Sequence, residues 1–148
     1  MNLSDNTPFN WPIRIYYEDT DVSGVVYHAN YLRFFERART EWLRYLGFDQ
    51  QRLMQDENIA FTIVSADIRY IVAARLDDQL LADVRLTRLR RASMEIEQSL
   101  YYVDNSHHSR VELSTAAVRV ACVDSRQFKP CALPDTMLNA FKSCLKTP

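Results

Sequence analysis

Three acidic side chains lie close together near the start of the chain, at Glu18, Asp19 and Asp21. A carboxylate in such a cluster can act as a nucleophile or as a general base. The same composition is also common in a solvated turn or a helix-capping region. Two neighbouring features favour chemistry: the apolar run at 25–27 should draw the loop into the protein, and a helix is expected directly after it.

That helix is predicted to run from about Asn30, a favourable N-cap residue, to Gly47, a typical C′ residue. Apolar side chains, among them Phe34, Phe35 and Trp42, recur at spacings of three and four, whereas arginines and glutamates fill the other side. The unpaired N–H groups of its first turn should lie beside the acidic loop. This arrangement suits thioester hydrolysis. A carboxylate can attack the thioester carbonyl or activate a water molecule, while N–H groups bind the carbonyl oxygen as it becomes negative.

Strands are predicted on both sides of the helix. One precedes it at residues 12–18, and four follow at 60–73, 80–90 (with a bulge near its end), 93–103 and 111–123. A short helix is expected over 48–56 and an amphipathic tail over 137–145. The order predicts an α+β fold in which an antiparallel sheet of about five strands wraps around one long helix. Because an uncovered sheet edge favours pairing, dimerisation is expected.

The overall composition excludes several classes of protein. A chain of 148 residues suits a single domain over 1–148, and a formal net charge of −1 argues against a nucleic-acid binder. No apolar stretch approaches the ~18 residues of a membrane span. The three cysteines, Cys122, Cys131 and Cys144, lack metal-like spacing, which favours reduced thiols. Residues 1–8 do not resemble a signal peptide, so we expect a cytoplasmic protein.

A resemblance to a known family rests on several motifs. The segment 14–31, RIYYEDTDVSGVVYHANY, and its continuation at 35–41, FERARTE, resemble the signature of the hotdog-fold 4-hydroxybenzoyl-CoA thioesterase family. The likeness is greatest to the YbgC-type acyl-CoA thioesterases, and it extends over roughly residues 11 to 142 through ARLDD at 74–78, CVD at 122–124 and KPCALP at 129–134. The resemblance implies a hotdog fold, an acyl-CoA substrate, no metal or redox cofactor, and a dimer or tetramer with sites at the subunit interface.

Carried over residue by residue, the resemblance implies that Asp21, the second aspartate of an Asp-x-Asp-x-x-Gly motif, is the catalytic carboxylate. It assigns the backbone N–H that polarises the thioester carbonyl to His28, whose imidazole is an alternative general base. Gly24 would allow the backbone to approach the thioester closely. Tyr27 and Asn30 also occupy motif positions, where they would shape the loop and the acyl pocket.

The basic cluster RLRRAS at 88–93 joins two predicted strands, and a solvated turn is its ordinary interpretation. By resemblance, the matching segment of coenzyme A-binding relatives contributes to phosphate binding, and arginine forks suit phosphate oxygens. Arg90, Arg91 and Ser93 are therefore candidate substrate-binding residues. The chain departs from the family pattern at 22–23, where Val-Ser replaces a small pair that is often Ala-Gly or Pro-Ala.

Several alternatives stay open at this point. The sequence does not decide whether Asp21 attacks the carbonyl or activates water, and it does not give the acyl chain length. A hotdog dehydratase would show a His-containing loop and a helix acid in a context that is absent here. The other alternative is a non-catalytic scaffold that binds acyl thioesters or acyl carrier protein. Genes of the family often neighbour the Tol–Pal envelope system, which would link such a scaffold to phospholipid metabolism or the cell envelope. Coenzyme A and acyl carrier protein present the same phosphopantetheine arm, so either is a possible carrier.

Overall fold

The computed structural model describes residues 8–104, 106 and 108–145. Residues 1–7, most of the segment in which no signal peptide is expected, lie outside the described part. The elements follow in the order β1 (Phe9–Arg14), a 3-10 turn η1 (Tyr17–Asp19), α1 (His28–Tyr45), α2 (Gln50–Glu57), β2 (Ile59–Tyr70), β3 (Gln79–Leu89), β4 (Ser93–Asp104), β5 (Ser109–Asp124) and α3 (Asp135–Cys144).

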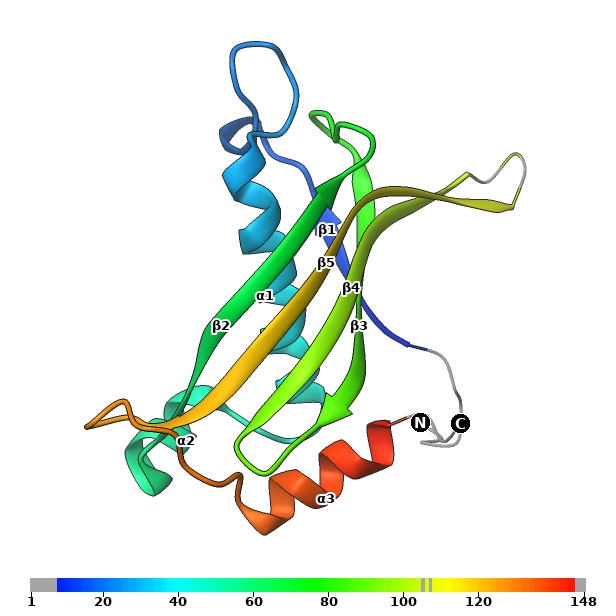
Figure 1. The fold of residues 1–148 in the computed structure, drawn as a ribbon. Coiled ribbons are helices and arrows are strands. Elements are labelled where there is room, and N and C mark those ends of the chain that lie inside the picture. Colours follow the sequence, from blue (N-terminus) through cyan, green and yellow to red (C-terminus); the bar gives the residue numbers. More distant parts are fainter. Residues whose placement is uncertain (1–7, 105, 107, 146–148) are drawn as a thin grey trace.

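The strands form one antiparallel sheet in the order β1-β3-β4-β5-β2. Figure 1 shows this sheet curving around α1, with the acidic loop above the start of the helix and α3 at the opposite end. The predicted α+β architecture is confirmed, and so is the bulge of the 80–90 strand, which lies between Leu86 and Arg88. No helix in the described ranges is long and apolar enough to cross a membrane.

The core lies between the apolar stripe of α1 and the inner face of the sheet. Phe34 and Phe35 are 0% and 1% exposed, and Trp42 is 4% exposed, as the periodicity predicts. Each such side chain contributes about 1.5–3 kcal/mol when it is fully buried. Phe141 of α3 stacks on Trp42 with ring centroids 5.4 Å apart, so α3 closes the core beside the end of α1.

Both ends of α1 are set by identifiable contacts. Gly47, with φ +97°, terminates the helix as predicted, and Phe48 N–H then donates to the Leu43 carbonyl at 2.8 Å. The predicted start at Asn30 is wrong, because the helix begins at His28. The Asn30 side chain does not cap the helix but donates through Nδ2 to the Asp19 carbonyl at 2.9 Å.

The first strand also differs from its prediction at residues 12–18, since β1 occupies Phe9–Arg14. The buried Asp19 explains the difference: its carboxylate accepts the Tyr16 N–H at 2.8 Å, and Asp19 N–H donates to the Tyr16 carbonyl at 3.0 Å. These two bonds fold Tyr17–Asp19 into a 3-10 turn instead of extending the strand.

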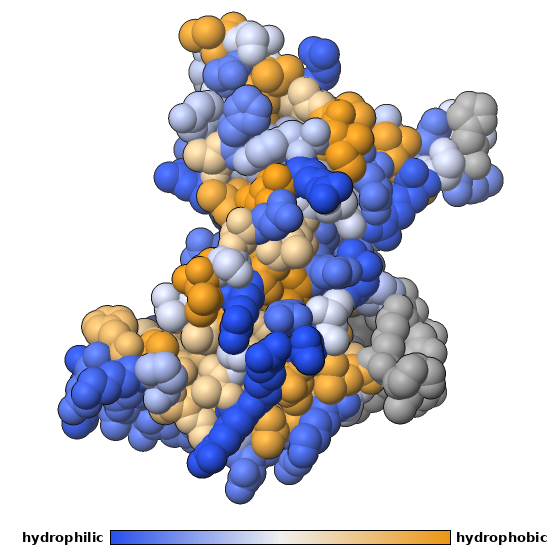
Figure 2. Space-filling model, viewed as in Figure 1, coloured by the Kyte–Doolittle hydropathy of each residue, from blue (hydrophilic) through white to orange (hydrophobic). Residues whose placement is uncertain are grey.

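The outer edge of the sheet at β2 is long and apolar. Within the described chain β2 pairs with β5 alone, and it leaves Ile63 47% and Val64 57% exposed. Just beyond its end, Ile71 is 57% exposed. Figure 2 shows orange, apolar side chains along the path that β2 takes in Figure 1. The opposite edge, β1, is only 6 residues long and contains Pro12, which makes β2 the edge suited to pairing.

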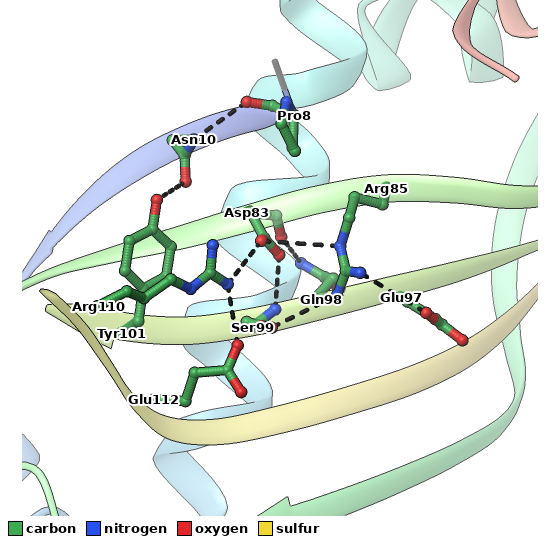
Figure 3. A network of polar contacts seen from close by, with 10 residues as sticks. All are labelled: Pro8, Asn10, Asp83, Arg85, Glu97, Gln98, Ser99, Tyr101, Arg110 and Glu112. Atoms are coloured by element: carbon green, nitrogen blue, oxygen red, sulfur yellow. Dashed lines mark hydrogen bonds and ion pairs between the residues drawn. The ribbon is translucent and has the colours of Figure 1, made fainter. Parts of the chain in front are cut away.

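A polar network joins four strands on the sheet face that points away from α1 (Figure 3). Asp83 of β3 is 1% exposed, and its carboxylate accepts the Ser99 N–H at 2.6 Å and Arg110 Nη2 at 3.0 Å. The Arg110 guanidinium lies 3.7 Å over the Tyr101 ring, and Tyr101 donates in turn to Asn10 of β1. The network therefore ties β1 and the β4–β5 hairpin to β3.

Candidate active site

The acidic loop is organised around Asp19. Its carbonyl accepts both the Tyr27 N–H at 3.1 Å and the Asn30 side-chain amide at 2.9 Å, while its carboxylate holds Tyr16. Asp19 is 9% exposed, so its hydrogen-bonding groups are committed to the loop itself. Asp19, the first aspartate of the motif, thus positions the loop at the start of α1. Asp21, the second, does not make these contacts.

Asp21 lies at the exposed tip of the same loop. A tight turn holds its backbone, since Asp21 N–H donates to the Val25 carbonyl at 2.9 Å and Gly24 N–H donates to the Asp21 carbonyl at 3.0 Å. Gly24 has φ +82°, a conformation that side chains disfavour, which explains a glycine at this position.

The Asp21 carboxylate is held on one side only. Ser23 donates to Oδ1 through its hydroxyl and through its N–H, the latter at 2.8 Å. These bonds keep the pKa of the Asp21 carboxyl below its usual value, with His28 adding a smaller electrostatic effect. Oδ2 has no hydrogen-bond partner in the part of the chain described, so an ionised oxygen faces solvent.

His28 supplies a backbone donor where the loop that carries Asp21 enters α1. It is the first residue of α1, and within the described ranges its N–H has no acceptor, as expected for a first helical turn. Its ring packs edge-on against Tyr70 with centroids 4.9 Å apart, and Tyr70 donates to the His28 carbonyl at 3.3 Å. The helix start is therefore anchored to the end of β2.

The segment after β2 holds the loop from the other side. Val26 N–H donates to the Ala74 carbonyl at 2.8 Å, and Ala74 N–H donates to the Tyr31 hydroxyl at 3.0 Å. Burial raises the pKa of Tyr31, which keeps this hydroxyl neutral. Sequence reasoning missed Tyr31, Tyr70 and Ala74 as parts of the site; the resemblance at 74–78 was the available signal for Ala74.

The structure brings together five of the predicted site residues on one loop and helix start: Asp21, Gly24, Tyr27, His28 and Asn30. It does not bring the basic cluster to them. Arg90 and Arg91 lie in the β3–β4 turn and Ser93 begins β4, at the opposite end of the sheet from the loop (Figure 1). The Arg90 N–H donates to the Ser93 carbonyl at 2.8 Å, and Arg90 Nη2 lies 3.8 Å from Glu95 Oε1.

A largely apolar cavity of about 190 Å³ lies between α1 and the β2 side of the sheet. Its lining includes apolar side chains of α1, β2, β4 and β5 together with a few polar groups from α1 and α2: Glu36, Arg39, Thr40, Trp42, Leu43, Gln50, Phe61, Ile63, Met94, Ile96 and Val120. Arg39 donates to Gln98 at 2.8 Å. Arg39 lies eleven residues beyond His28, or about 16 Å along the helix, so the cavity is remote from Asp21 of the same chain.

Comparison with known proteins gives the family. Residues 16–141 match the model of the thioesterase-like superfamily. The acyl-CoA thioesterase YbgC of Haemophilus influenzae is 47% identical over 133 residues, which cover 90% of this chain and 93% of that protein. The crystal structure of a probable thioesterase from Bartonella henselae has a TM-score of 0.78 at 36% identity, covering 86% of this chain and 100% of that one.

A 4-hydroxybenzoyl CoA thioesterase mutant complexed with 4-hydroxybenzoyl CoA has the same fold, with a TM-score of 0.81 at 19% identity over 91% of this chain and 96% of that one. The chain therefore belongs to the thioesterase-like superfamily and has the hotdog fold. The enzyme class predicted from the sequence, a thioester hydrolase, is confirmed.

Proposed function

We propose that this protein is an acyl-CoA thioesterase whose chemistry is carried out by Asp21 and the N-terminal end of α1. The observation that carries the proposal is that one loop and helix start present both an ionised Asp21 carboxylate with one free oxygen and an unused N–H at His28. The YbgC relative, named as an acyl-CoA thioesterase and 47% identical, supports acyl-CoA as the substrate class.

In this mechanism the thioester carbonyl oxygen accepts the His28 N–H, and the positive end of the helix stabilises the charge that develops there. Asp21 then acts in one of two ways. Its free oxygen attacks the carbonyl carbon, expels the thiolate and leaves an acyl-aspartyl anhydride that water cleaves, or it removes a proton from a water that attacks directly. Both routes release a free acid and a thiol, and both need the ionised carboxylate.

We further propose that the working unit contains a homodimer formed through β2. The exposed Ile63 and Val64 and the open strand edge support this, because a second copy would satisfy the backbone groups and cover the side chains. Two β2 strands related by a twofold axis pair in antiparallel fashion. Within one β2, Ile63 lies beside the cavity and Tyr70, at the end of the strand, packs against His28. Pairing would therefore place the acidic loop of one protomer next to the cavity of its partner.

In this dimer the cavity and the basic cluster would each bind one part of the substrate. The acyl group would extend from the His28 N–H into the cavity of the partner. Arg90, Arg91 and Ser93, distant from Asp21 in their own chain, would lie at the same end as the partner's loop. There they would bind coenzyme A phosphates. Acyl carrier protein carries the same arm and is the second carrier that such a site would accept.

Thiol release from a series of acyl-CoAs of graded chain length tests the proposal. We expect hydrolysis well above the spontaneous rate, with a chain-length optimum set by the cavity. The same samples, run on a light-scattering column, should elute as dimers or tetramers. Absence of hydrolysis over the whole series would overturn the assigned activity, and a fully active monomer would overturn the shared site.

A further inference from the structure

Two of the cysteines lie opposite each other on adjacent extended segments. Cys122 is in β5, and Cys131 follows the turn after it, where its N–H donates to the Cys122 carbonyl at 3.0 Å. The next pair along is an antiparallel bridge between Val123 and Pro130, and Asp124 N–H donates to the Lys129 carbonyl at 2.8 Å. The register therefore places Cys122 and Cys131 directly across from each other.

This register suits a covalent bond between them. Directly opposed residues of an antiparallel pair have Cα atoms about 4.5–5.5 Å apart. Disulfides require a Cα separation of about 4.4–6.8 Å, so the backbone need not move. The two sulfur atoms are 3.6 Å apart and both thiols are free, so rotation about the side-chain bonds suffices to join them.

We propose that Cys122 and Cys131 are a modification site, at which a peroxide converts the two thiols into a reversible intrachain disulfide. Cys131 is half-buried and can meet an oxidant, whereas Cys122 is 1% exposed and can be reached through Cys131. This inference rests on the strand register and the sulfur contact, and it stands whether or not the proposed thioesterase mechanism is correct.

The reaction would proceed in two steps. The Cys131 thiolate attacks one oxygen of hydrogen peroxide, the O–O bond breaks, and a sulfenic acid forms while the departing hydroxide takes up a proton to become water. The Cys122 sulfur then attacks the Cys131 sulfur, the S–O bond breaks, and hydroxide leaves as water with the Cys122 proton. Two thiols are oxidised by two electrons in all, and one peroxide is reduced to two waters.

The surroundings assign the two roles. Burial, together with the neighbouring Cys131 thiol, raises the pKa of Cys122 to about 12, so Cys122 is a poor first nucleophile. It therefore acts second, once the sulfenic acid lies beside it. Cys144 of α3 contacts no other thiol in the described chain and donates to the Ala140 carbonyl at 3.4 Å, which makes it an internal control.

The disulfide would close the turn between β5 and Cys131 beside the basic cluster. Cys122 N–H donates to the Ala92 carbonyl at 2.8 Å, and Leu133 N–H donates to the Arg91 carbonyl at 2.9 Å. These bonds connect both sides of the cysteine pair to the β3–β4 turn. Oxidation would therefore hold this turn and the segment around Cys131 together as one unit.

Peptide mapping of the full-length protein tests the proposal. The protein is treated with hydrogen peroxide, its remaining thiols are blocked with N-ethylmaleimide, and it is digested with trypsin without reduction. Cys122 and Cys131 fall in different tryptic peptides, 120–126 and 127–142, because the Lys129–Pro130 bond resists trypsin. We expect a cross-linked pair 2 Da lighter than the sum of the two peptides, lost on treatment with dithiothreitol.

Matched variants decide the assignment. Cys131→Ser should abolish the cross-link, and Cys144→Ser should leave it at the wild-type level. Since Cys131 is half-buried, its serine variant should fold even if Cys122→Ser does not. Oxidation of Cys131 to a sulfinic acid, 32 Da heavier and without any cross-link, would overturn the proposal, as would linkage of either residue mainly to Cys144 or to another molecule.

Discussion

Among the residues of the polar network on the outer sheet face, the buried Asp83 is predicted to contribute most to the free energy of unfolding. Replacing it with alanine leaves the Ser99 N–H without an acceptor inside the sheet, which costs about 1–3 kcal/mol. It also removes the bond from Arg110, whose side chain is 39% exposed and regains solvent, so this loss is at the low end for a charged bond. We expect Asp83→Ala to lower the free energy of unfolding by about 2–4 kcal/mol.

Two further variants separate the contributions. Asp83→Asn keeps an acceptor for Ser99 and loses only the charge, so its effect should be smaller than that of the alanine variant. Glu112 accepts from the same Arg110 at 3.1 Å but is 43% exposed, and Glu112→Gln should therefore cost less than about 1 kcal/mol. Urea unfolding at pH 7, followed by far-ultraviolet circular dichroism, measures all three. Equal losses for Asp83→Ala and Glu112→Gln would refute the reasoning from burial.

Three more predictions concern the site itself. Ser23→Ala removes the hydroxyl that lowers the pKa of Asp21, so the Asp21 pKa should rise. The acid limb of the kcat/KM profile, where activity is lost as Asp21 is protonated, should then move to higher pH. An unchanged acid limb would contradict this. Ile63→Lys places a charge at the open β2 edge, so light scattering should show monomers and activity should fall together, and an active dimer would count against the shared site. Tyr31→Phe leaves the buried Ala74 N–H unpaired and should lower the urea midpoint by an amount equivalent to about 1–3 kcal/mol. An unchanged midpoint would show that the hydrogen bond between Ala74 and Tyr31 does not stabilise the fold.

Local patterns predicted the parts of the fold that depend on local energetics. The apolar spacing of Phe34, Phe35 and Trp42 specified a helix face, and Gly47 marked where the helix must end. The start of the same helix was misplaced, since the Asn30 side chain bonds to Asp19 across the loop. A cap prediction considers only neighbours along the chain and could not anticipate this contact.

Features of the site that depend on contacts between distant segments were not predictable in the same way. Tyr70 meets His28 across 42 positions of sequence, and no local pattern indicates that contact. Arg90 and Arg91 were grouped with Asp21 by resemblance, whereas the antiparallel topology puts them at opposite ends of the sheet within one chain. A second protomer would be needed to bring them together. The resemblance implied such a site at the subunit interface, but no local pattern within the chain indicates it.

The most direct test of the central claim compares thiol release by the wild type, Asp21→Asn and Glu18→Gln on the best acyl-CoA substrate. Glu18 is an exposed carboxylate in the same loop and serves as the matched control, with circular dichroism confirming that each variant is folded. We predict that Asp21→Asn lowers kcat by about 10²–10⁴-fold, the usual contribution of a positioned acid–base group, while Glu18→Gln stays near the wild type. A folded Asp21→Asn protein as active as the wild type would contradict the assignment of the chemistry to Asp21.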